Sequence, residues 1–185
     1  MSGMITAGTE CIRKYRYLVT KMKFPTSIIP TFINLSKIFI NSMLIVAIII
    51  VFWAFGFKPD IYLLQIPFYL VLAFVFFNLW ALFSSFIGAI SKDFVNLVKS
   101  FLTAVFWLSG ILWNTNTATN PWLIRFLNLN PITFLVNGFR NCFINKIWFW
   151  EQPKRLMYFG IITLILLIAG LWSYKKLRKD IADVL

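Results

Sequence analysis

The side chains whose chemistry stands out in this sequence are cations. The 185 residues carry 18 Lys and Arg against 6 Asp and Glu, with no His and two Cys. Arg140 lies in an otherwise apolar stretch, Phe134 to Phe143, and Arg125 lies in a similar one. A guanidinium group binds phosphate through two parallel hydrogen bonds, so both arginines are candidates for holding a diphosphate or polyanionic substrate. The alternative for Arg140 is an arginine at headgroup level that pairs with a lipid phosphate.

The same inventory excludes several kinds of chemistry. The six acids all fall at loops or at the ends of apolar segments, and no catalytic constellation is present. Carriers driven by protons or sodium usually need an ionisable residue inside the bilayer. The sequence has no phosphate-binding loop of the GxxxxGK type, so the chain does not hydrolyse nucleotide itself. No Cys/His cluster suits zinc, and cations that flank apolar segments indicate membrane topology rather than nucleic-acid binding.

Polar and aromatic side chains also occur inside the apolar segments. Asn34, Lys37 and Asn41 share one side of a helix by their i, i+3, i+7 spacing. Such residues either form hydrogen bonds between helices or line a polar path. The aromatic residues either pack and face lipid or offer a stacking surface for sugar rings. The candidate path residues are Asn34, Asn41, Asn78, Ser100, Phe76 and Trp107.

The elements that must position these residues are membrane-spanning helices. The chain is 60% hydrophobic and 13% charged, too apolar for a soluble domain of this length. It is predicted to be an all-α, polytopic membrane helix bundle that forms a single domain over 1–185. Each predicted span has the roughly 17–20 residues needed to cross the hydrocarbon core. The four spans are 31–55, 62–90, 94–113 and 156–174.

Between the last two spans, residues 114–155 contain apolar pieces that are too short to cross. They are predicted to form re-entrant or interfacial helices on the outer side, broken at Asn130-Pro131. Residues 1–30 are basic, and Thr9 to Lys23 is predicted to be a short helix along the membrane surface that ends at Pro25.

Orientation follows from the basic residues. With both termini inside, 12 of the 18 Lys and Arg lie on the cytoplasmic side and 6 outside, which favours a cytoplasmic tail over 175–185. The six on the outside are more than this rule predicts and call for a further reason. This topology separates Cys11 from Cys142, so the two are not expected to pair.

Several stretches resemble one family. Leu18 to Pro25 with the following Ile28 to Pro30, and Leu129 to Phe134 followed by Arg140, resemble the ABC-2 type polysaccharide export permeases. The Lys-rich end from Lys175 to Asp180 also fits. Within the family, the chain looks most like the wall teichoic acid translocation permeases of Gram-positive bacteria. The resemblance covers nearly the whole chain.

The resemblance implies roles for two segments. Such permeases typically have six spans, and this chain begins where the loop after the second span would lie, as expected for the C-terminal two-thirds of a permease: a gene fragment, an incorrectly placed start or a split gene. Residues 9–23 would then be the coupling helix that docks on the ATPase subunit, and 114–150 would hold two gate helices. The implied coupling residues are Arg13, Lys14, Arg16, Leu18, Lys21, Lys23, Phe24 and Pro25. The candidate gate and substrate residues are Arg125, Asn130, Pro131 and Arg140.

The resemblance also implies partners and a location. Two permeases, as a homodimer, and two ATP-binding subunits would export a teichoic acid polymer on an undecaprenyl diphosphate lipid across the bacterial plasma membrane. ATP and magnesium would be held by the partner subunit, and this chain would bind no cofactor and no nucleic acid. Membrane lipids are the other expected contact. The alternatives are an O-antigen or capsular polysaccharide permease, a drug or bacteriocin exporter, and an inactive fragment or membrane scaffold.

Overall fold

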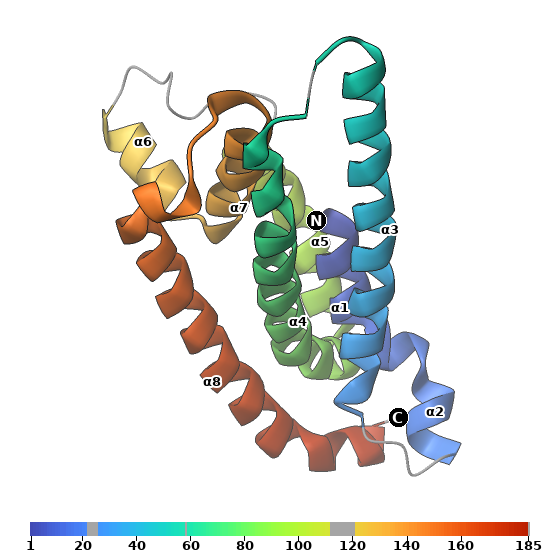
Figure 1. Cartoon of the computed structure of the whole chain (residues 1–185). Coiled ribbons are helices and arrows are strands. Elements are labelled where there is room, and N and C mark those ends of the chain that lie inside the picture. The colour runs from blue at the N-terminus through green and yellow to red at the C-terminus, as the bar shows by residue number, and fades with distance from the viewer. Residues whose placement is uncertain (22–25, 58, 112–120, 185) are drawn as a thin grey trace. The chain divides into compact units, whose positions relative to one another are not determined.

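The fold is all-α, as predicted. The computed structural model describes residues 1–21, 26–57, 59–111 and 121–184, without the side chains of 19–21, 121, 123, 126 and 177–184. Within these residues every regular element is a helix (Figure 1). The α-helices are α1 (Ser2–Lys14), α2 (Arg16–Lys21), α3 (Ile28–Ala54), α4 (Ile66–Ile90), α5 (Lys92–Leu108), α6 (Pro121–Asn128), α7 (Pro131–Arg140) and α8 (Pro153–Val184). The short helices are η1 (Ile61–Gln65), the π-helical η3 (Asn141–Asn145) and η4 (Phe149–Glu151).

Three helical segments of the described chain are long and apolar enough to cross a membrane. They are Ile28–Ala54, Ile61–Ile90 and Pro153–Lys176, with mean hydropathies of 2.4, 2.2 and 2.2. A 27-residue helix such as α3 rises about 40 Å, more than the roughly 30 Å of hydrocarbon. No residue in the most apolar stretch of α3 is buried within the chain, so its side chains must be covered by lipid or by another subunit.

Helix α5 corresponds to the span predicted over 94–113. It has 17 residues, ends at Leu108 and is not among the three segments above. Gly110 follows in a left-handed conformation, with φ +70°, and residues 112 and 113 lie outside the described residues. Leu97 and Phe101 of α5 are exposed, as a lipid-facing stripe would be. A fourth crossing by this segment stays a prediction.

The chain divides into two compact units, described separately below. Unit 1 comprises residues 1–39, 74–102 and 163–185, and unit 2 comprises residues 40–73 and 103–162.

The N-terminal segment differs from the predicted surface helix over 9–23. A break at Tyr15 (φ −104°, ψ 31°) separates α1 from α2. Thr9, Cys11 and Ile12 are fully buried in unit 1, so the first turn of the predicted surface helix contributes to the core. This part of α1 is buried because small residues let it approach α4 closely. A methyl group added to Gly88 of α4 would collide with the Thr9 carbonyl oxygen, so the two helices lie closer together than bulkier residues would allow.

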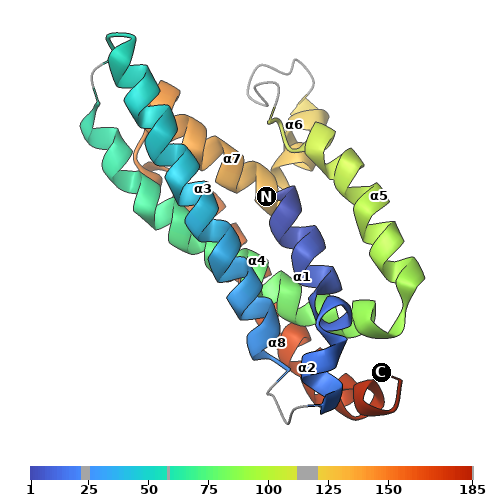
Figure 2. The same cartoon turned by 90° about the vertical axis from the view of Figure 1, so that its right-hand side faces the viewer.

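Unit 1 is held by apolar packing and by interhelical hydrogen bonds. Its core gathers Cys11, Ile12, Ile29, Phe86 and Ala89. The Thr9 and Ser84 hydroxyl oxygens lie 3.0 Å apart, and the Ser173 hydroxyl donates to the Phe83 carbonyl oxygen at 3.2 Å. Figure 2 shows α1 between α5 and the first half of α3. Small and polar residues of this kind join helices in membranes.

The core of unit 2 is aromatic. Tyr69 of α4 is 2% exposed and packs with Ile66 and Cys142. Its ring lies directly against Gly138 of α7. Gln65 connects η1 to the start of η4. Its amide nitrogen donates to the Ile147 carbonyl oxygen at 3.2 Å, and its amide oxygen accepts from the Phe149 backbone N–H at 2.8 Å.

Candidate functional site

Two short helices of unit 2 carry the predicted gate residues. The break expected at Asn130-Pro131 is the point at which α6 has ended and α7 begins. The Asn130 side chain accepts a hydrogen bond from the Ile132 backbone N–H at 3.0 Å, and Pro131 occupies the first position of the helix. An Asn cap followed by Pro is a strong start signal for a helix. In this structure the two residues therefore start α7, and their role in gating stays a prediction.

A cavity of about 330 Å³ opens beside these helices, and we refer to it as the cationic cavity. Arg125 reaches it from the last turn of α6, and Lys154 and Arg155 reach it from the first turn of α8. Its other lining residues are Asn128, Leu129, Phe134, Asn137 and Tyr158. None of its described lining residues is acidic, so three positive charges share one hollow without a compensating carboxylate among them.

The geometry of the cationic cavity is set by contacts between distant parts of the chain. The Tyr158 hydroxyl of α8 donates to the Leu129 carbonyl oxygen at 3.0 Å, which connects α8 to the turn between α6 and α7. The Arg155 guanidinium lies 3.5 Å from the Gln152 side-chain oxygen. Cations at the N-terminus of a helix are unfavourable, because the positive end of the helix dipole lies there. An anion in the cavity would be stabilised both by the three cations and by that dipole.

Arg140 lies at the end of α7 and is half-buried rather than projecting into open space. One guanidinium nitrogen donates to the Asn137 side-chain oxygen at 3.2 Å, and the other donates to the Gly110 carbonyl oxygen at 2.9 Å. Asn137 also lines the cationic cavity. Arg140 is therefore positioned to orient a lining residue and to hold the segment after α5, whereas Arg125 faces the cavity directly.

Lys154 and Arg155 are two of the six cations that the predicted topology places outside, but they were not among the predicted gate and substrate residues. The signal was available: two adjacent cations at the start of an apolar span, on the side where few cations were expected. What the sequence did not contain was their proximity to Arg125, which lies 29 positions before Lys154 in the chain.

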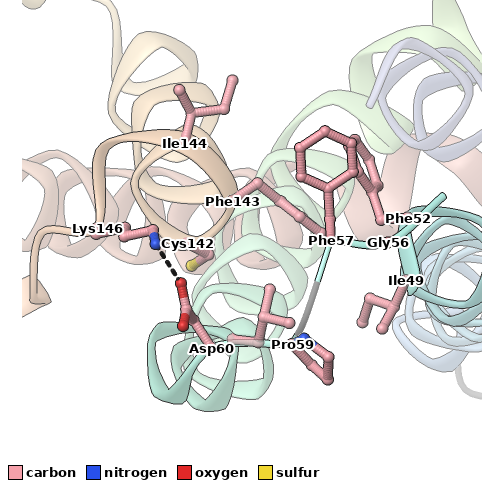
Figure 3. Close-up of a pocket in the computed structure, with 11 residues that line it drawn as sticks. Ile49, Phe52, Gly56, Phe57, Pro59, Asp60, Cys142, Phe143, Ile144 and Lys146 are labelled. Atoms are coloured by element: carbon pink, nitrogen blue, oxygen red, sulfur yellow. Dashed lines mark ion pairs between the residues drawn. The ribbon is translucent and has the colours of Figure 1, made fainter.

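A second hollow of unit 2, which we call the apolar pocket, is lined by η1, η3 and the end of α3. It has a volume of about 580 Å³, and its apolar lining includes Ile49, Phe52, Phe57, Leu63 and Phe143 (Figure 3). Asp60 and Lys146 point toward one another beside Cys142, and form an ion pair at 2.5 Å. The backbone of Lys146 is left-handed, with φ +53°, which is uncommon for a residue other than glycine.

The pocket combines an apolar lining with one ion pair, in which the charges of Asp60 and Lys146 neutralise each other. The hydrogen bond from Lys146 to Asp60 raises the pKa of the lysine above its ordinary value. Burial raises the pKa of the Cys142 thiol to about 11, which lowers the fraction of reactive thiolate at neutral pH. In the described part of the chain, no three His, Cys, Asp or Glu side chains come together as a metal site would require.

The other predicted residues lie in several environments. Among the coupling residues, Lys14 and Arg16 are exposed and Arg13 and Leu18 are half-buried. Lys23, Phe24 and Pro25, and the side chain of Lys21, lie outside the described residues.

The predicted path residues differ among themselves. Asn34 is fully buried, and its amide nitrogen donates to the Phe77 carbonyl oxygen at 2.9 Å, which favours the interhelical hydrogen bond over the polar path for this residue. Phe76 is buried, Asn41 and Asn78 are half-buried, and Ser100 and Trp107 are exposed. A path that these six residues line together stays a prediction.

The long apolar helices define a multi-pass α-helical membrane protein, and the three cations of the cationic cavity suit an anionic group. The family model for the ABC-2 type transporter matches residues 1–144, and the chain belongs to that family. It is therefore a membrane subunit of a transporter. The O-antigen export system permease protein RfbA of Myxococcus xanthus is 21% identical over 183 residues, which are 98% of this chain and 70% of that protein.

Proposed function

We propose that this chain is the permease subunit of an ABC exporter for a lipid-linked, phosphate-bearing cell-surface polymer, with wall teichoic acid as the leading candidate. A separate ATP-binding subunit would supply the energy, and a second copy of the permease would complete the path. The chain would lie in a bacterial plasma membrane with both termini in the cytoplasm. The family match supports the transporter role, and the name of the Myxococcus relative supports a polysaccharide cargo.

The observation that carries the choice of cargo is the cationic cavity. Arg125, Lys154 and Arg155 face one hollow of about 330 Å³, and none of the lining residues that the structure describes is acidic. A teichoic acid has a phosphate diester in each repeat, so successive repeats could exchange places against the same three cations. A charge pair at 4 Å contributes about 1 kcal/mol in bulk water and several times more where water is partly excluded. The repeats of a neutral polymer would gain none of this attraction, which would be confined to the diphosphate of its lipid carrier.

The second candidate cargo is an O-antigen or capsular polysaccharide, which the name of the relative favours. Both cargoes would arrive on a lipid diphosphate, and both would suit the apolar pocket equally well. The two cargoes differ in the polymer itself. A repeat without phosphate carries no anion that could pair with the three cations of the cationic cavity.

The decisive experiment measures polymer-stimulated ATP hydrolysis by the complete exporter in proteoliposomes. The variant Arg125→Gln/Lys154→Gln/Arg155→Gln is compared with the control Lys37→Gln/Lys175→Gln/Lys176→Gln, which removes three exposed cations of unit 1. We expect the cavity variant to need at least tenfold more phosphate-bearing polymer than the unaltered exporter for half-maximal stimulation of ATP hydrolysis. The control should need the same concentration as the unaltered exporter. Equal stimulation of both variants would refute the phosphate-polymer assignment.

A further arm separates the two cargoes. The same lipid diphosphate carrying a neutral polymer should stimulate the unaltered exporter poorly. If the neutral polymer stimulates it as well as the phosphate-bearing one, the O-antigen alternative replaces the proposal.

A further inference from the structure

A second basic hollow lies in unit 1, far along the chain from the cationic cavity, and we call it the α1–α5 groove. It has a volume of about 420 Å³ and lies between two helices. Helix α1 contributes Glu10, Arg13 and Lys14, spaced i, i+3, i+4, and α5 contributes Lys92, Val95, Asn96 and Lys99, spaced i, i+3, i+4, i+7. Each set is one face of a helix. The groove is therefore formed by two facing helix surfaces and not by a chance meeting of loops.

The charge of the groove is strongly unbalanced. Four cations and one carboxylate line it, a net charge of +3. The single carboxylate is already used, because Glu10 forms an ion pair with Lys99. In the described part of the chain, no ion pair involves Arg13, Lys14 or Lys92. Three cations held around one hollow repel one another, and an anion between them would relieve that repulsion.

Helix α1, which forms one side of the groove, is held in place by contacts with α4. Thr9, one residue before Glu10, forms a buried hydrogen bond with Ser84 of α4. Gly88 at the end of α4 lies against the Thr9 backbone and beside Val95, which itself lines the groove. Because the cations project from helices that are already packed, binding requires little reorganisation of the backbone.

The setting of the groove indicates where the anion comes from. Helix α5 presents Leu97 and Phe101 on the opposite side from the groove residues, and these side chains are 62% and 65% exposed. The back of α5 therefore suits hydrocarbon while its front is cationic. Cations near the end of a spanning helix extend to the phosphate headgroups, while the apolar side chains of the same helix contact acyl chains. We infer that the α1–α5 groove binds the phosphate of an anionic phospholipid headgroup, independently of the polymer that the exporter moves.

The test measures retention of phosphatidylglycerol by the purified full chain in nanodiscs of neutral lipid. The variant Arg13→Gln/Lys14→Gln/Lys92→Gln removes three groove cations, and the control Lys37→Gln/Lys175→Gln/Lys176→Gln removes three exposed cations of the same unit that do not line the groove. At roughly a fivefold contribution for each of the three cations that share the groove, the groove variant should bind the lipid about 100-fold more weakly than the unaltered chain. The control should change less than threefold.

Further arms make each outcome informative. The charge-retaining variant Arg13→Lys/Lys14→Arg/Lys92→Arg should bind normally. If the triple glutamine variant does not fold, as judged by circular dichroism, the single variants Lys14→Gln and Lys92→Gln should each weaken binding several-fold relative to Lys37→Gln. Equal weakening in groove and control variants, or none in either, would overturn the inference. So would saturation of the groove by inorganic phosphate with no preference for the lipid.

Discussion

The contact between Gly138 and Tyr69 offers the sharpest prediction about how α7 is held. A methyl carbon added at Gly138 would lie 2.6 Å from two Tyr69 ring carbons, Cδ1 and Cζ, and closer still to Cε1. Carbon atoms normally pack at about 3.5–4.0 Å. The ring has little room to retreat, because Tyr69 is 2% exposed and has the rings of Phe134 and Phe139 about 6 Å away. The change Gly138→Ala must therefore displace α7 or tilt the ring.

The magnitude follows from two opposing terms. Overpacking of a buried site typically destabilises by about 1–3 kcal/mol, while replacing Gly by Ala within a helix stabilises by about 1 kcal/mol. The matched control is Gly160→Ala in α8, where an added methyl group meets nothing within 4 Å. The helix term is common to both variants, so the control should be about 1–3 kcal/mol more stable than Gly138→Ala.

The assay is unfolding of the full chain in mixed micelles by increasing SDS, followed by circular dichroism. A double-mutant cycle with Tyr69→Leu isolates the pair, because removing part of the ring should reduce the penalty of Gly138→Ala. A Gly138→Ala variant as stable as Gly160→Ala would show that Tyr69 does not pack against α7. A penalty that persists unchanged in the Tyr69→Leu background would lead to the same conclusion.

Two further predictions concern unit 2. Asn130→Ala should destabilise the start of α7 by about 1 kcal/mol, because it removes the side-chain hydrogen bond to the Ile132 backbone N–H. Asn130→Asp should keep that hydrogen bond. The SDS unfolding midpoints of the two variants check this, and equal midpoints would rule out the cap. In a Cys11→Ser background, Cys142 should react with maleimide at pH 8 about 100-fold more slowly than an exposed thiol, because burial raises its pKa from 9.0 to about 11. The rate should keep rising between pH 9 and pH 11 instead of levelling off near 9, and a plateau at the lower pH would contradict the burial of the thiol.

The sequence determined the features that depend on local composition. Runs of apolar residues predicted spanning helices, and three segments of the structure have the length and hydropathy for that role. The expected break at Asn130-Pro131 lies where α7 begins, because an Asn cap and a Pro at the first helical position act through neighbouring backbone groups. Such signals need no knowledge of distant residues. The same local character explains why the resemblance to a transporter family was visible in the sequence.

Tertiary structure decided which charges meet. Arg125 shares a cavity with Lys154 and Arg155 because the Tyr158 hydroxyl reaches the Leu129 carbonyl oxygen from 29 positions away. Arg140 turns to the Gly110 carbonyl oxygen, 30 positions earlier, a contact that no periodicity encodes. Thr9, Cys11 and Ile12 are part of the core because Gly88 offers a surface without a side chain. In each case the deciding quantity is the distance between helices far apart in the chain, and that distance depends on how the helices pack, which local sequence patterns do not encode.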